Sequence, residues 1–158
     1  MEDYKLDPKI VIDAALAAAE MLTGMGYNGK YGSVHLLELE IQTNTLTAIL
    51  HNMVAWQIAE RDKRWTFHAK GGPTPDLTDS RGKGIEIKVT SDKYIKGNQV
   101  SLNTGYYVAV KYTREAFIVK INWILMGELK GDDWEKRPGT QWAILKREAK
   151  ERLESIYP

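Results

Sequence analysis

Two carboxylates and one lysine give this sequence its clearest chemical possibility. They are Asp76, Glu86 and Lys88, within the stretch PTPDLTDSRGKGIEIKVTS. Side chains alternate between the faces of a strand, so Glu86 and Lys88 are expected to share an exposed face while Ile87 points into a core. Two carboxylates that meet at one point repel each other unless a cation lies between them. Oxygen ligands beside a lysine favour magnesium over zinc.

The segment between these residues is suited to bring them together. The stretch SRGKG, at 80–84, carries two glycines and is predicted to reverse the chain. A strand that ends near Asp76 would then run antiparallel to a strand over 84–90. Asp76 and Glu86 are therefore expected to converge.

At these residues the sequence resembles the PD-(D/E)XK nuclease superfamily, in which an acidic residue on one strand and Glu-x-Lys on the next build a magnesium-dependent phosphodiesterase site. Asp76 matches the first acid, Glu86 the second and Lys88 the lysine. Pro75 directly before the acid fits the same pattern. The resemblance implies a magnesium ion that bridges Asp76 and Glu86, and the backbone carbonyl of Ile87 is expected to be a further ligand.

Two assignments around this site depend on the same resemblance. Lys88 either holds the attacking water or lies beside the phosphate oxygens as a fixed cation, and the sequence leaves both roles open. Members of the superfamily often add a glutamate from an upstream helix, and Glu38 or Glu40 is the expected counterpart. Glu60 is explained instead by an i,i+4 pair with Arg64.

The segment after Lys88 is rich in amide, hydroxyl and ammonium groups and shows no apolar periodicity. Restriction endonucleases, which the chain resembles in size and in its helix-first order, commonly place recognition residues beyond this strand. We expect Lys93 and Lys96 to hold phosphates. The polar side chains expected to read base edges are Asn98, Gln99, Asn103 and Thr104.

Composition sets limits on the class of protein. A chain of 158 residues predicts one domain over 1–158, and the absence of cysteine excludes disulfides and cysteine-ligated zinc. Without a leader or a long apolar run, a cytoplasmic protein with no membrane segment is expected. The glycine-rich stretches GYNGKYG and KGG lack the order of a phosphate loop, so no nucleotide cofactor is expected.

Charge is unevenly distributed along the chain. The net charge is +1, yet residues 1–60 carry three Lys and Arg against eight Asp and Glu, whereas residues 61–96 carry nine against five. The positive segment is the one that contains the candidate site. This distribution suits a phosphate backbone as the partner.

Helices are expected at both ends of the chain. Asp7 and Pro8 predict a helix start, with an end near Gly24 or Gly26, and GYNGKYG reads as a loop. A long helical pattern over 33–62, in one or two pieces around QTNTLT, has Leu39, Leu46, Leu50, Met53 and Ile58 as its expected buried stripe. Residues 35–41 alternate and are also compatible with a strand. A final helix is predicted from Thr140, with Trp142, Leu145, Ala149, Leu153 and Ile156 on its apolar side.

Strands are expected between these helices. The stretches WTFHA, GIEIKVT, YYVAVKYT and AFIVKINWILM, together with the segment at Asp76, predict a meander whose last turn lies at Arg114 and Glu115. The expected fold class is α/β, with a restriction-endonuclease-like core in which a central mixed sheet of four or five strands is flanked by helices.

Other polar residues are given no site role. His35, His51 and His68 are far apart and lack metal-ligand spacing, so they are interpreted as exposed or internally hydrogen-bonded histidines. The acidic run at 132–135 is interpreted as a solvated turn.

The sequence thus predicts a magnesium-dependent type II restriction endonuclease that cuts double-stranded DNA at a specific, palindromic site. One site per chain implies a homodimer, with the Ala-rich faces of ALAAAEML and TLTAILHNMVAW as the expected dimer surface. The alternatives are a structure-specific nuclease such as a Holliday-junction resolvase and a non-catalytic DNA-binding protein on the same fold. A net charge of only +1 argues against a resolvase, and the intact acidic and lysine set argues against loss of activity.

Overall fold

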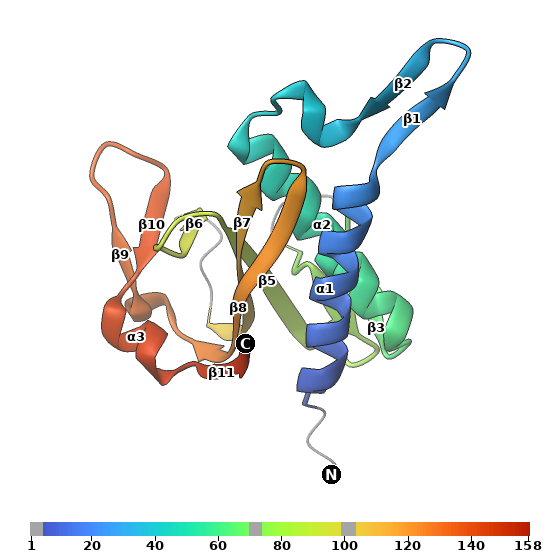
Figure 1. The fold of residues 1–158 in the computed structure, drawn as a ribbon. Helices are drawn as coiled ribbons and strands as arrows, with labels where there is room; N and C mark the ends of the chain where they lie inside the picture. The colour runs from blue at the N-terminus through green and yellow to red at the C-terminus, as the bar shows by residue number, and fades with distance from the viewer. Residues whose placement is uncertain (1–4, 70–73, 99–103) are drawn as a thin grey trace.

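The computed structural model describes residues 5–69, 74–98 and 104–158, and its largest element is a six-stranded mixed sheet (Figure 1). All neighbouring strands are antiparallel except β5 and β7, which are parallel. In spatial order the strands are β11 (Glu154–Tyr157), β8 (Ile118–Leu129), β7 (Gly105–Glu115), β5 (Gly84–Thr90), β4 (Leu77–Asp79) and β3 (Trp65–Phe67).

The α/β class with a mixed sheet is confirmed, but the strand number and the meander were wrong. Six strands form instead of four or five, because the C-terminal segment adds β11 beside β8. The meander fails because β6 (Lys96–Asn98) leaves for another sheet, so the chain returns to pair β7 parallel to β5. The turn between β7 and β8 lies at Ala116 and Phe117, just beyond the predicted position.

Two helices cover one face of the sheet (Figure 1). Helix α1 spans Pro8–Gly24 as predicted, and the Asp7 side chain caps it by accepting a hydrogen bond from the Lys9 N–H. Helix α2 spans Thr43–Arg61. Four alanines of α1, at positions 14, 15, 18 and 19, are buried in the core that α1 and α2 share with the sheet. The Ala-rich face expected at a dimer interface is therefore largely used inside this chain.

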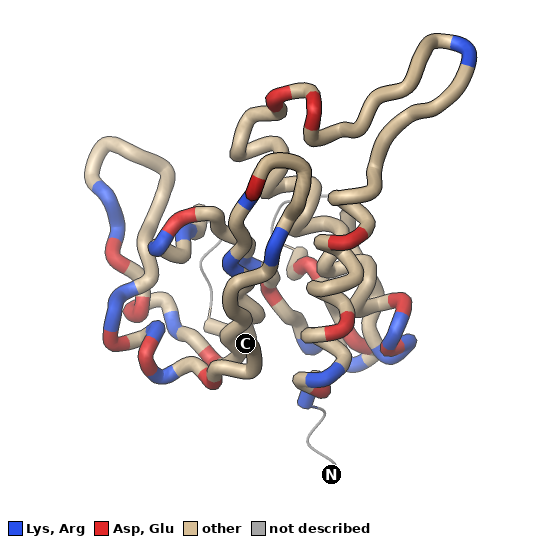
Figure 2. The backbone as a smooth tube through the Cα atoms, viewed as in Figure 1, with Lys and Arg blue, Asp and Glu red and all other residues tan. Residues whose placement is uncertain are grey.

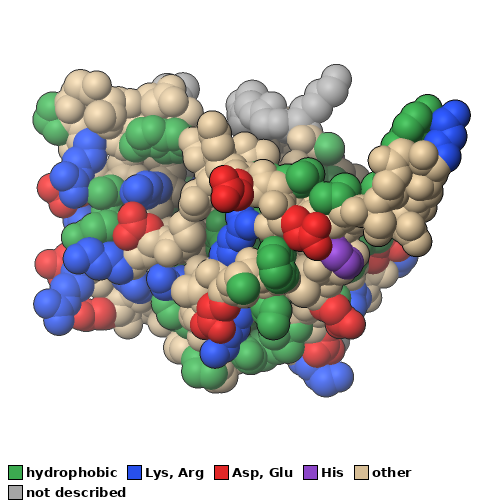
Figure 3. All heavy atoms as spheres, turned by 45° about the horizontal axis from the view of Figure 1, so that its top comes forward, with side chains coloured by type: hydrophobic (Ala, Val, Ile, Leu, Met, Phe, Trp, Pro, Cys, Tyr) green, Lys and Arg blue, Asp and Glu red, His purple; other side chains and the backbone are tan. Residues whose placement is uncertain are grey.

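The connection from α1 to α2 differs from the prediction of a loop followed by a long helix. GYNGKYG belongs to a hairpin of β1 (Gly26–Gly29) and β2 (Gly32–His35), which projects from the body of the molecule (Figures 1 and 3). A short 3-10 helix, η1 (Leu36–Leu39), follows, so of residues 35–41 only His35 lies in a strand. Glu40 has a φ of 47°, a left-handed conformation that stops helix continuity before α2 begins.

The predicted stripe of the long helix is confirmed only within α2. Leu46, Leu50 and Ile58 are buried and Met53 packs against the core. Leu39 lies in η1 and is 57% exposed.

The second face of the sheet carries a smaller layer. A three-stranded sheet of β6, β10 (Trp142–Leu145) and β9 (Trp134–Lys136) packs there with η2 (Gly131–Asp133) and α3 (Arg147–Arg152). The predicted final helix was thus mostly wrong, because residues 142–145 pair with both β6 and β9. Leu145, Ala149 and Leu153 are buried as expected.

No helix in the described part of the chain is long and apolar enough to cross a membrane.

Candidate active site at the free edge of β5

The candidate site begins where the β4–β5 ladder stops. Leu77 pairs with Ile85, and the same register extended by two residues would place Pro75 opposite Ile87. Proline has no N–H with which to continue the ladder. Side chains complete it instead: the Asp76 Oδ2 atom accepts the Ile87 N–H at 2.7 Å, and His51 Nε2 lies 3.0 Å from the Ile87 carbonyl oxygen.

His51 reaches this edge from α2, on the helical side of the sheet. Its Nε2 atom also lies 3.3 Å from Asp76 Oδ2, and its Nδ1 atom lies 3.0 Å from Asn52 Oδ1. Only 26% of the His51 side chain and 18% of the Asp76 side chain are exposed. One imidazole therefore contacts two of the three groups that the sequence predicts as metal ligands, Asp76 and the Ile87 carbonyl.

Glu86 and Lys88 project from the other face of β5. Ile85 and Ile87 point into the helical core, so the alternation predicted for this strand is confirmed. Lys88 Nζ lies 3.7 Å from Glu86 Oε2. Both side chains are less than one quarter exposed, which places the ion pair in a partly desolvated position.

The pKa values of Glu86, Asp76 and His51 depend on burial and on the charges of their neighbours. Burial together with the nearby Asp76 charge raises the pKa of Glu86 to about 7, although Lys88 opposes this rise. For Asp76, burial alone would raise the pKa, but the His51 contact, the Ile87 N–H and Lys88 together lower it. The pKa of His51 is raised because its contact with Asp76 outweighs burial. Asp76 is thus favoured as the anion, whereas Glu86 holds a proton until the pH approaches neutrality.

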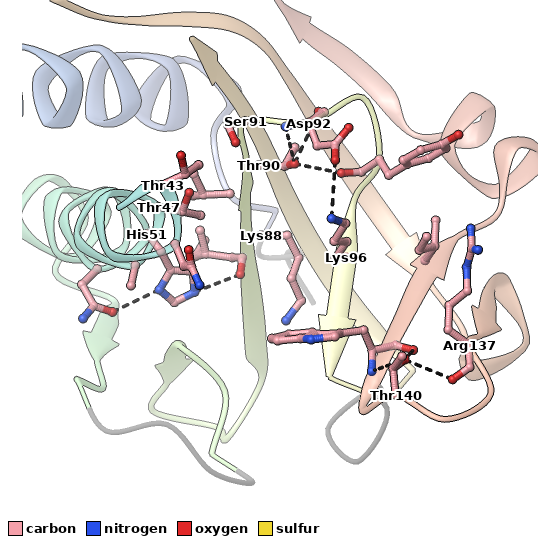
Figure 4. A pocket seen from close by; sticks show the side chains of 18 of the residues that line it. Thr43, Thr47, His51, Lys88, Thr90, Ser91, Asp92, Lys96, Arg137 and Thr140 are labelled. Atoms are coloured by element: carbon pink, nitrogen blue, oxygen red, sulfur yellow. Dashed lines mark hydrogen bonds and ion pairs between the residues drawn. The ribbon is translucent and has the colours of Figure 1, made fainter. Parts of the chain in front are cut away.

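His51, Ile87 and Lys88 line a groove of about 1140 Å³ (Figure 4). Helix α2 forms one wall with Thr43, Thr47 and His51, which recur every four residues and so share one helix face. The free edge of β5 forms the floor, from which Lys88 projects. The opposite wall comes from the small sheet, and the residues of this wall are Lys96, Arg137, Pro138, Thr140, Trp142 and Ile144.

A second hollow of about 830 Å³ lies on the other side of Glu86. Its walls include Lys83, Lys130 and Arg152 as well as Glu128 and Asp133. The lobe of β6, β9, β10 and α3 carries many Lys and Arg residues interspersed with acids (Figure 2). The groove and the hollow therefore meet at the Glu86–Lys88 pair with cationic side chains on both sides.

The predicted recognition segment is only partly at this groove. Lys96 lines it and pairs with Asp92 at 3.4 Å, whereas Lys93 is not part of its lining and lies over the Tyr94 ring. Asn98 lies in β6, and Thr104 lines the second hollow. Gln99 and Asn103 lie outside the described residues.

Glu38 and Glu40 do not reach the site. Both are exposed, on η1 and at its end, and neither lines the groove or the second hollow. The upstream helix instead contributes His51, for which the sequence predicted no site role. The available signal was the i,i+4 row of Thr43, Thr47 and His51, a polar row on a helix that also carries the buried Leu46, Leu50 and Ile58.

No protein-family model matches this chain, and no curated protein matches it. Any functional assignment therefore depends on the chemistry of the site itself.

Gly84 is expected to be sensitive to substitution because of its contact with Pro75. A Cβ atom added at Gly84 would lie 2.4 Å from Pro75 Cγ and 2.8 Å from its Cβ, and a proline ring has no rotamer that relieves such a contact. Gly84→Ala should displace Pro75 and with it Asp76, at a cost of about 1–3 kcal/mol in stability. Urea unfolding measures this loss, and Gly131→Ala, where an added Cβ meets nothing within 4 Å, is the control. Equal stability of the two variants would contradict the assigned contact.

Proposed function

We propose that the protein is a magnesium-dependent endonuclease that hydrolyses phosphodiester bonds in double-stranded DNA. The observation that carries the proposal is the meeting of Asp76, Glu86 and Lys88 around β5, where Lys88 lines the groove and Glu86 lines the hollow beside it. The donor set also fits the ion. Two carboxylates and the Ile87 carbonyl supply the oxygen atoms that magnesium prefers.

Asp76 and Lys88 have separate roles in the proposed reaction. A bound magnesium ion supplies Lewis-acid stabilisation of the phosphate charge and a more acidic water. Asp76 is held in place by the Ile87 N–H and by His51, so its carboxylate needs little reorganisation to act as a ligand. Lys88 lies beside Glu86 on the same face of β5, where its ammonium group can orient the water or stabilise the developing charge.

Double-stranded DNA is the substrate that the groove suits best. The polar row of α2 and the cationic side chains of the small sheet line opposite walls, so a phosphate backbone on the β5 floor would meet Lys88, Lys96 and Arg137. One site per chain cuts one strand. We therefore propose a C2 homodimer that cuts both strands of a palindromic target, as a type II restriction enzyme does.

Incubation of supercoiled plasmid DNA with the protein and magnesium tests this proposal. Discrete linear fragments with uniform ends are expected, and chelation of the metal should stop their formation. Cutting only of four-way junctions would identify a resolvase-like nuclease instead. Retention of DNA without cleavage under any divalent metal would reject the nuclease proposal.

Phosphate contacts in the groove should appear in the salt dependence of DNA binding. Calcium replaces magnesium so that DNA is bound without being cut. Under these conditions Lys96→Ala is expected to weaken binding to cognate and to random DNA alike. The slope of log affinity against log salt should fall by roughly one unit, because one phosphate contact is lost. Lys120→Ala is the control, since Lys120 is an exposed lysine of β8 that does not line the groove. The same slope for both variants would place the DNA elsewhere.

A further inference from the structure

The placement of His51 has a consequence for the metal. Its Nε2 atom lies 3.3 Å from Asp76 Oδ2 and 3.0 Å from the Ile87 carbonyl oxygen. In octahedral coordination with bonds of about 2.0–2.2 Å, two neighbouring ligand atoms are about 3 Å apart. The two separations around Nε2, which are hydrogen-bond distances in this structure, are therefore also close to those of adjacent ligands on a single ion.

We propose that His51 is a ligand of the metal in this site and that the site binds manganese or cobalt more tightly than magnesium. The proposal rests on the proposed function only for the presence of a metal site. Magnesium prefers oxygen ligands and gives up its water reluctantly, whereas imidazole nitrogen suits the later divalent ions. One nitrogen among the donors therefore shifts the preference toward manganese and cobalt.

The orientation of the ring favours this role. Nδ1 lies 3.0 Å from Asn52 Oδ1, so an Nδ1–H donated to this oxygen leaves the Nε2 lone pair directed at Asp76 and Ile87. Histidine ligands commonly have such a partner on the second nitrogen, which fixes the tautomer and the ring. In the metal-free protein an Nε2 proton makes the contacts with the two oxygens, and that proton is released when the ion binds.

Glu86 would complete the set by a side-chain rotation. Among residues 5–69, 74–98 and 104–158, no three His, Asp or Glu side chains already form a metal cage. Glu86 is turned toward Lys88 at 3.7 Å, while the Ile87 donor is a backbone oxygen. The partly formed arrangement is therefore one imidazole, one carboxylate and one carbonyl, which a rotated Glu86 would join.

Metal titration without DNA tests the proposal. Calorimetry should give tighter binding of manganese than of magnesium to the wild-type protein. His51→Gln retains an amide that can donate to the Ile87 oxygen but removes the nitrogen ligand. Its preference for manganese over magnesium is expected to fall at least about tenfold. The matched control is His68→Ala, because His68 is also a partly buried histidine, but its Nε2 atom contacts Thr78 Oγ1 at 2.7 Å.

Pulsed electron paramagnetic resonance of the bound manganese provides a readout that needs no variant. A ¹⁴N coupling from a directly bound imidazole is expected in the wild-type protein and in His68→Ala, and its loss is expected in His51→Gln. Absence of this coupling in the wild-type protein, or an unchanged metal preference in His51→Gln, would overturn the proposal.

The two proposals fail in distinguishable ways. Cleavage supported by magnesium, with no ¹⁴N coupling to manganese, would overturn the role of His51 and leave the nuclease standing. The coupling without cleavage of any DNA would support His51 as a ligand and reject the nuclease.

Discussion

Replacement of Asp76 by Asn, Glu86 by Gln or Lys88 by Ala is expected to lower the rate of DNA cleavage by a factor of at least about 1,000, which corresponds to about 4 kcal/mol of activation free energy. The first two changes remove a charged metal ligand, and the third removes the cation beside it. Asp76→Asn keeps an oxygen that can accept the Ile87 N–H, so the local backbone should stay in place. Single-turnover cleavage with magnesium measures the effect.

Matched control variants separate loss of chemistry from loss of structure. Glu38→Gln and Glu40→Gln also remove one carboxylate each, but both residues are exposed and neither lines the groove. They are expected to cut DNA at the wild-type rate. Circular dichroism should show folded protein for every variant. Wild-type cleavage by Asp76→Asn would overturn the assignment of the metal ligands.

Glu86→Gln is also expected to change how stability depends on pH in the metal-free protein. The pKa of Glu86 is raised from 4.5 to about 7 in the folded state, chiefly by burial and by the Asp76 charge. Between these two values the folded protein binds more protons at this residue than the unfolded chain does. Stability contributed by Glu86 therefore falls as pH rises from about 4.5 to about 7 and stays low above that pH.

The expected size of this change in stability follows from the pKa shift of Glu86 and from the exposure of its side chain. A change of about 2.5 pKa units corresponds to about 3 kcal/mol, and solvent screening of a carboxylate that is 23% exposed reduces this to about 2 kcal/mol. Because glutamine does not titrate, the stability of Glu86→Gln relative to wild type should rise by about this much as the pH is raised from 5 to 8.

Urea unfolding in the presence of a chelator measures the difference at both pH values. Groups that titrate in both proteins and lie away from Glu86 cancel in the comparison, so the change in the difference reports on Glu86 together with its neighbours Asp76 and His51. Glu40→Gln, which removes an exposed carboxylate that lines neither hollow, is measured beside it as the matched control. A constant difference for Glu86→Gln would contradict the raised pKa.

Local sequence signals predicted the elements whose formation depends on nearby residues. Asp7 and Pro8 specify the start of α1 through capping and a preset φ, and the alternation at 84–90 specifies which side chains of β5 face the core. Asp76 and Glu86 could be paired because two glycines between them mark a reversal. These signals operate over a few residues, so no tertiary contact was needed to read them.

Residues 142–145 show where local signals fail. Their pattern is compatible with a helix, yet they form β10 because β6 and β9 offer hydrogen-bonding edges on both sides. The partner β6 lies more than 40 residues earlier in the chain. Tertiary pairing overrides local preference in such a segment.

The sequence by itself determined the acid, acid and lysine set, its spacing and the strand that carries two of its members. Which other groups lie beside these three residues was decided only by the tertiary structure. His51 and Ile87 are 36 residues apart and meet only when α2 packs across β5. The packing of α2 brings an imidazole to the edge that Pro75 leaves unpaired, and it leaves Glu38 and Glu40 outside the groove. Such a meeting depends on long-range packing, which periodicity and spacing along one segment do not encode.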